Sequence, residues 1–185
     1  MALPEIMIGA PETVGGAVAA APVGSALPTD ATSALGSEFT VRGLIGEEGF
    51  SLAPSRDTTD VKVWGGATKR RLTTDYQETI TVTFMESADA EVLKAVFGEE
   101  NVTESDGKIT IAHNVVGPSE KAWAFTMKDG DARRRVVVPE GQLFLSSDVV
   151  YVHTDAIKYQ VEIACLQDED GNTTYEYIYD EATGA

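Results

Sequence analysis

The chain has 185 residues, which is enough for one globular domain that buries most of its apolar surface without disulfides. Its formal net charge is −16, from 30 acidic and 14 basic residues. That balance argues against an ordinary role in binding DNA, RNA or an anionic membrane, because those partners are held by clustered Lys and Arg.

Residues 1–36 are rich in Ala, Gly, Pro, Ser and Thr and have no sustained apolar period. Such a segment cannot build its own core, so we predict an N-terminal arm that is flexible or orders on a partner. Its apolar start, Ile6 to Ile8, is a candidate contact between subunits. The missing basic leader argues against a secretory signal, and no run is long enough to span a bilayer, which predicts a soluble protein made inside a cell.

The remaining residues, 37–185, are predicted to form one β domain. Its first part, 43–59, contains Gly, Glu, Pro and Ser and is predicted to be a polar excursion that orders on a neighbouring subunit, although part of it can pair as a strand. Phe50 within it is a candidate contact residue. The next stretch reads DTTDVKVWGGATKRRL from Asp57 to Leu72 and predicts a turn, a short strand at 61–64, a bend at Gly65-Gly66 and a basic strand.

Alternating apolar residues then predict strands over 79–84, 123–127, 157–165 and 175–179, with shorter apolar runs at 136–138, 143–145 and 149–152. The total is about eight to ten strands. Asp-Gly pairs at 106–107, 129–130 and 170–171 predict hairpin turns between strands, and sequential hairpins indicate an antiparallel sheet.

One helix is predicted over 87–98. Ser87 is the expected N-cap and Gly98 the expected stop, and the helix carries an apolar stripe at 92, 93, 96 and 97. In a chain of strands this stripe must lie across a sheet face or a barrel end. We therefore predict a mainly β fold, an antiparallel β-sandwich or barrel flanked by one α-helix.

The sequence offers little chemistry. His113 and His153 lie forty positions apart at strand edges, outside any metal-binding spacing, and are interpreted as structural. Cys165 cannot form an internal disulfide and lies in an alternating run, which predicts a buried, inert thiol. Asp57 and Asp60 could form the carboxylate pair of an acidic hydrolase, but no partner base accompanies them. We therefore predict no enzyme activity, no metal and no cofactor.

Two further features have competing interpretations. The segment from Asp168 to Asn172 resembles the start of a calcium loop, but its glycine comes too early, so a solvated turn is favoured over a weak calcium site. Tyr175, Tyr177 and Tyr179 share one face of a strand, where core or protein interface is favoured over glycan binding.

Two basic triplets interrupt the acidic chain, Lys69-Arg70-Arg71 and Arg133-Arg134-Arg135. In a strand the middle residue points to the opposite face from its neighbours, so neither triplet makes a one-sided nucleic-acid stripe. They are either solvated strand faces or edges that meet the acidic surface of an identical subunit.

Three segments together resemble a known family: DTTDVKVWG from Asp57, TVTFME from Thr81 and EVLKAVFG from Glu91. Their order and content are similar to the central block of major tail proteins, the tail tube subunits of long-tailed bacteriophages with non-contractile tails. The resemblance covers residues 57–98. It implies a β-barrel or sandwich with one flanking helix, a fold shared with the tube-forming protein of type VI secretion systems.

The resemblance also implies a function. Six copies would form a ring, and stacked rings would form the tube through which double-stranded DNA passes into the host. The implied partners are further copies of the chain and the tape measure, tail tip and terminator proteins, with no membrane partner. The location would be the virion tail, after synthesis in the host cytoplasm. The alternative hypothesis is a β-rich host-facing decoration or glycan-binding module of a virion, with the tyrosine strand exposed.

Overall fold

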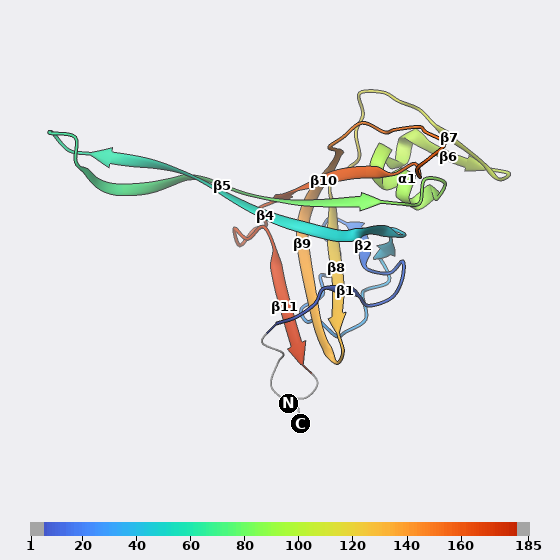
Figure 1. The fold of residues 1–185 in the computed structure, drawn as a ribbon, viewed down its shortest axis with the longest axis horizontal. Helices are drawn as coiled ribbons and strands as arrows, with labels where there is room; N and C mark the ends of the chain where they lie inside the picture. Colours follow the sequence, from blue (N-terminus) through green and yellow to red (C-terminus); the bar gives the residue numbers. More distant parts are fainter. Residues whose placement is uncertain (1–5, 181–185) are drawn as a thin grey trace.

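The computed structural model describes residues 6–180 and is built almost entirely from antiparallel strands, with one α-helix in this part of the chain (Figure 1). The elements in chain order are β1 Ala10–Pro11, β2 Val18–Pro22, β3 Thr40–Val41, β4 Ile45–Lys62, β5 Thr68–Phe84, α1 Ala90–Phe97, a 3-10 turn Glu99–Asn101, β6 Val102–Ser105, β7 Lys108–Ile111, β8 Lys121–Asp129, β9 Ala132–Leu145, β10 Tyr159–Leu166 and β11 Tyr175–Asp180. The predicted mainly β, antiparallel fold with one helix is confirmed.

Nine of these strands form one sheet in the order β3-β2-β8-β9-β10-β5-β4, with β1 added to β8 and β11 added to β9. The sheet branches at β9. Since β8 occupies one edge of β9, both β10 and β11 pair with the other edge, at 140–145 and 132–137 respectively. Pro139 lies between these two pairings and lacks the N–H that a continuous ladder would need.

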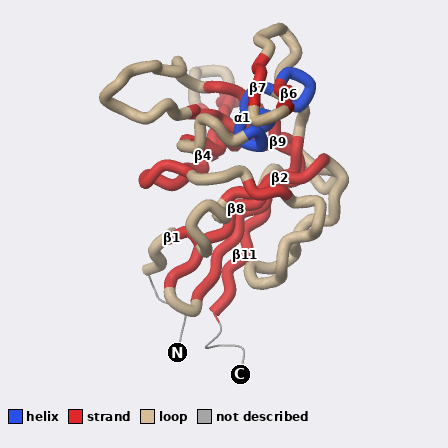
Figure 2. The backbone as a smooth tube through the Cα atoms, turned by 90° about the vertical axis from the view of Figure 1, so that its right-hand side faces the viewer, coloured by secondary structure: helices blue, strands red, loops and turns tan. Residues whose placement is uncertain are grey.

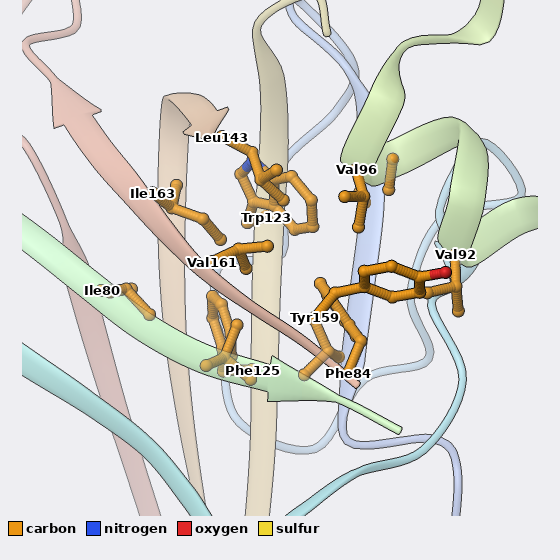
Figure 3. Packing of buried hydrophobic residues seen from close by; sticks show 14 of the residues in the cluster. Ile80, Phe84, Val92, Val96, Trp123, Phe125, Leu143, Tyr159, Val161 and Ile163 are labelled. Carbon is orange, nitrogen blue, oxygen red and sulfur yellow. The ribbon is translucent and has the colours of Figure 1, made fainter. Parts of the chain in front are cut away.

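The sheet curls over itself to enclose the core. Phe50 of β4 lies 4.6 Å from Phe125 of β8 between ring centroids, although three strands separate β4 from β8 in the sheet order. Figure 3 shows Trp123 of β8 and Val161 of β10 facing each other across this core. The arrangement is that of a β-sandwich, and α1 lies beside β6 and β7 at one end of it (Figure 2).

The helix begins two residues later than predicted. Its N-cap is Asp89, whose carboxylate accepts hydrogen bonds from the backbone N–H groups of Glu91 and Val92, each at 2.9 Å. Asp at this position also carries a charge that favours the positive end of the helix dipole, so it is a better cap than Ser87. The stop at Gly98 is confirmed, with φ of 97° and an N–H bonded to the Lys94 carbonyl at 2.9 Å.

The prediction that residues 1–36 form a flexible arm is wrong for the part that contains β2. This strand pairs with β8, and residues 17–21 are buried. Val18 and Ala20 lie opposite Phe125 and Trp123 on the core face, while Ala19 lies on the other face of the sheet and is also buried. Small side chains fill the limited space beside the bulky ones, so a run without alternation becomes an inner strand.

Two strand predictions are corrected. Residues 149–152 lie in the loop between β9 and β10 and are not a strand. Asp170-Gly171 does turn the chain, but the strands on either side, β10 and β11, pair with β9 and not with each other. The other two Asp-Gly pairs join paired strands as predicted, β6 to β7 and β8 to β9.

Gly141 of β9 is expected to tolerate no side chain. A Cβ at this position would lie 2.7 Å from Ile163 Cγ2 and 2.9 Å from Trp123 Cδ1. Gly141→Ala should therefore lower the free energy of unfolding by about 1–3 kcal/mol, measured by urea denaturation. Gly117→Ala is the control, because nothing lies within 4 Å of its added Cβ. Equal stability of the two variants would show that the core around Trp123 is looser than described.

Candidate assembly surface

The most prominent feature outside the body is a long β-ribbon. The outer halves of β4 and β5 leave the sandwich together and project away from it (Figure 1). We call residues 53–75 the hairpin arm; every residue in it except Asp60 is exposed to solvent. At about 3.3 Å per residue, the strand from 53 to 62 extends about 30 Å. An isolated two-stranded hairpin is marginally stable in water, so this arm is of a kind that a partner surface would stabilise.

The tip of the arm is a tight turn that presents a tryptophan. Val63 N–H donates to the Ala67 carbonyl at 3.0 Å, and Gly65 and Gly66 adopt φ of 99° and 86°, values that favour glycine. Trp64, directly before these glycines, has a relative exposure of 104%. A large aromatic side chain held fully in water at the end of a projection is typical of a residue that is buried in a complex.

The tip is also basic. Residues 61–71 contain Lys62, Lys69, Arg70 and Arg71 and no acid, within a chain of net charge −16. Arg71 Nε donates to the Asp60 carboxylate at 2.8 Å on one face of the ribbon. On the opposite face Val61 lies across from Arg70. The structure thus brings the first predicted basic triplet together with Trp64 at one exposed place.

The second triplet is not a single surface. Arg134 forms an ion pair with Glu176, and Arg133 lies 3.4 Å from the Glu12 carboxylate. Arg135 is only 3% exposed; its guanidinium donates to the Asp30 and Ser33 carbonyls at 3.0 Å each and to the Thr126 hydroxyl at 3.1 Å. Burial lowers the pKa of Arg135. This residue holds the loop after β2 on the sheet, which contradicts its prediction as a contact with another subunit.

The other predicted contact residues lie in different places. Ile6 and Ile8 are 85% and 69% exposed, next to β1, while Met1 to Glu5 lie outside the described residues. Phe50 packs partly buried against Phe125 within the chain. As contacts between subunits, Ile6, Ile8, Phe50, Lys69, Arg70, Arg71, Arg133 and Arg134 remain predictions.

An open groove lies at the far end of the same ribbon. Its volume is about 960 Å³, and it is lined by the start of β4, the end of β5 and the loop before β10. Apolar side chains from Ile45, Met85, Val150 and Val152 line it together with acidic ones. The acidic lining residues are Glu47, Glu48, Asp148 and Asp155, and Lys158 is paired with Asp155 at 3.0 Å.

Glu78 links the base of the arm to the body through hydrogen bonds. This residue of β5 is 8% exposed, and its carboxylate accepts hydrogen bonds from the hydroxyl groups of Tyr76 at 2.7 Å, of Thr174 at 2.8 Å and of Thr173. Burial raises the pKa of Glu78, but the hydroxyl donors together outweigh burial, so its pKa lies below the ordinary value. The network ties the base of the arm to the loop before β11.

The Glu78 network predicts a pH dependence. The pKa of Glu78 is lower in the folded chain than in the unfolded chain, so the ionised carboxylate stabilises the fold. This contribution to the free energy of unfolding is fully present above the unfolded-state pKa of about 4.3 and is lost as the pH falls through the folded-state pKa. Glu78→Gln should lower the free energy of unfolding by about 1–3 kcal/mol at pH 7 and less at pH 3. Urea denaturation at a series of pH values measures this, with the exposed Glu120→Gln as control. A difference from wild type that stays constant with pH would contradict the role of the carboxylate.

The cysteine and the two histidines do not come together in a common site. Cys165 is buried as predicted, and burial raises its pKa to about 12, so the thiol stays protonated. His113 packs edge-on against Phe97 at 5.1 Å between ring centroids, and His153 lies in an exposed loop. Between residues 6 and 180, no group of three or more His, Cys, Asp or Glu side chains is placed to hold a metal ion.

The two remaining candidate sites are the 168–172 turn and the tyrosines of β11, and both make contacts within the chain. The Asp168 carboxylate accepts from the Tyr175 hydroxyl at 2.6 Å and from the Asn172 N–H at 2.9 Å, and these bonds lower its pKa. Tyr175 and Tyr177 are half-buried on β9 with parallel rings 6.5 Å apart, and Tyr179 is more exposed. This is not an open platform of three tyrosines.

Trp64 and the groove were not predicted. The signal for Trp64 was present in the sequence, since a tryptophan directly before two glycines lies at a turn, where the chain projects into solvent. The groove had no comparable signal, because it is assembled from segments near residues 47, 84 and 152. No helix in the described part of the chain is long and apolar enough to cross a membrane.

A sheet-built body with a projecting, exposed ribbon defines a structural protein that functions by assembly. A family model described as phage tail tube protein matches residues 13–185, and the chain therefore belongs to that family. A comparison with curated proteins gave no match. The match confirms the resemblance seen over residues 57–98, extends it in both directions and includes β2. The chain is thus a structural component of a phage tail.

Proposed function

We propose that copies of this chain close into hexameric rings and that the rings stack into the tail tube, the conduit for DNA ejection. The observation that carries this proposal is the hairpin arm, which exposes two strand edges and a tryptophan that nothing in the described chain covers. Unpaired edges and apolar tips are normally covered by a partner. Symmetric assembly of identical subunits would supply that cover for every copy.

The charge of the chain supports the conduit. A net charge of −16 gives an acidic surface, which repels phosphate and lets DNA pass without capture. The basic tip must then be covered by protein in the tube and kept away from DNA. A mobility-shift assay of the assembled protein should show no tight binding of duplex DNA at 150 mM salt, about the physiological ionic strength.

The proposal includes the further partners of a tail tube. These are the tape measure protein inside the tube, the tail tip from which it grows and the terminator that ends it. The chain would be made in the host cytoplasm and function in the virion, with no enzyme activity. The alternative of a glycan-binding module gains no support, because Tyr175 and Tyr177 are half-buried against β9.

Negative-stain electron microscopy of the purified chain at increasing concentration tests the proposal. We expect rings or hollow tubes of uniform width, formed by the chain alone or on added tail tips. A chain that remains monomeric under both conditions would contradict self-assembly. Filaments without a central channel would contradict the conduit.

A further inference from the structure

We propose that the tip of the hairpin arm of one copy docks into the groove of a second copy, with Trp64 inserted among the apolar side chains of the groove. This inference rests on the proposed self-assembly and assigns the two surfaces that carry it. The occupant is a second copy of this chain because the two surfaces match in polarity and charge.

The apolar parts match first. Trp64 is fully exposed, and Val61 and Val63 beside it are each 44% exposed. The groove presents Val150 and Val152, which are 57% and 48% exposed, next to Ile45 and Met85. Docking would remove both sets from water, and a buried aromatic anchor in a pocket is the usual centre of a protein interface.

The charges match in the same arrangement. The tip carries four basic residues and no acid over 61–71, and only Arg71 has an ion-pair partner among the described residues. The groove carries Glu47, Glu48, Asp148 and Asp155 against a single Lys158. Opposite charges around an apolar contact select the partner and its orientation.

The backbone of the groove offers further acceptors. The register between β4 and β5 shifts between Ile45 and Phe50, so residues 46–49 bulge out of the ladder. Backbone groups in a bulge are left free of regular strand pairing. They lie in the wall of the groove, where the indole N–H of an incoming Trp64 needs an acceptor.

A copy cannot fill its own groove. The tip lies at one end of the β4/β5 ribbon, and the groove lies at the other, where β4 begins and β5 ends (Figure 1). Fifteen residues of strand between positions 47 and 62 correspond to about 50 Å. The contact is therefore between different copies and head-to-tail, which is the kind of contact that generates closed rings or open stacks.

A charge exchange tests the contact. The tip variant carries Lys69→Glu with Arg70→Glu, and the groove variant carries Glu47→Lys with Glu48→Lys; all four side chains are exposed. Each variant alone should need a protein concentration at least about tenfold higher than wild type to assemble, because like charges then meet at the contact. An equimolar mixture should recover assembly, because the acidic tip of one variant faces the basic groove of the other.

Sedimentation velocity over a concentration series measures these effects, with Lys108→Glu on β7 as a charge-changing control that should assemble as wild type does. Wild-type assembly in either variant alone would overturn the docking while leaving self-assembly intact. Failure of both variants without recovery on mixing would also overturn it. A wild-type chain that stays monomeric throughout would overturn both the docking and the proposed function.

Cross-linking gives a readout that does not depend on charge. Trp64→Cys on one copy and Val150→Cys on another should form a disulfide under mild oxidation, since the native Cys165 is buried and does not compete. Val14→Cys, at a site 88% exposed but away from the arm, replaces Trp64→Cys as the control. Equal cross-linking of Val14→Cys and Trp64→Cys to Val150→Cys would overturn the docking.

Discussion

Replacing Trp123 with alanine is expected to lower the free energy of unfolding by about 3–5 kcal/mol. Trp123 is 1% exposed and lies in the middle of the core (Figure 3). Its indole N–H donates to the Gly141 carbonyl at 3.2 Å. The variant leaves a cavity between β8 and β10 and removes that donor. Urea denaturation followed by far-ultraviolet circular dichroism measures the change without using tryptophan fluorescence.

The second tryptophan of the chain is the control. Trp64→Ala removes the same kind of side chain from the tip of the arm, where it is fully exposed to solvent. Its free energy of unfolding should stay within about 0.5 kcal/mol of wild type. Similar losses from both substitutions would mean that the arm packs on the body, contrary to the structure.

The end of β5 and the strand β10 could be predicted because one face of each is buried more deeply than the other. Ile80, Val82 and Phe84 at the end of β5 point into the core, and the residues between them are less buried. The same pattern marks β10, where Val161 and Ile163 are fully buried. This alternation identified strands of the sandwich, but it carries no information on the branched order of the sheet.

The same rule explains why β2 and the hairpin arm were poorly predicted. β2 is buried on both faces and reads Val-Ala-Ala-Ala-Pro, so it shows no alternation. The arm is exposed on both faces, so its strands show none either. The strand near Val61 and the basic strand after the bend were predicted, but the turn predicted at Asp57 is wrong, because this residue lies within β4. β8 is also buried on both faces, but its large apolar residues Trp123, Phe125 and Met127 alternate with small ones, so it could be predicted where β2 could not.

The candidate contacts were predictable where they are local and unpredictable where they depend on distant segments. Lys69, Arg70 and Arg71 are adjacent in sequence and lie at the start of β5, directly after the turn, so they are all close to the exposed tip. Arg135 follows Arg134 directly, but it is buried because a loop about a hundred residues away covers it. This burial depends on a segment that is distant in sequence, so it cannot be predicted from the three arginines alone.

Shortening the hairpin arm should abolish assembly while leaving the body folded. In this variant an Asn-Gly turn replaces residues 57–75 and joins Arg56 to Tyr76, which are already paired across the ribbon. The deleted residues bury little within the chain, so the free energy of unfolding should stay within about 1 kcal/mol of wild type. Thermal unfolding followed by circular dichroism measures that stability.

The most direct test of the account is sedimentation velocity of the wild-type and arm-shortened chains side by side over the same concentration series. The central claim is that this tail tube protein assembles through its arm. We expect the wild type to pass from monomer to large assemblies as the concentration rises, and the arm-shortened chain to remain a folded monomer at every concentration. An arm-shortened chain that assembles as readily as the wild type would contradict the claim.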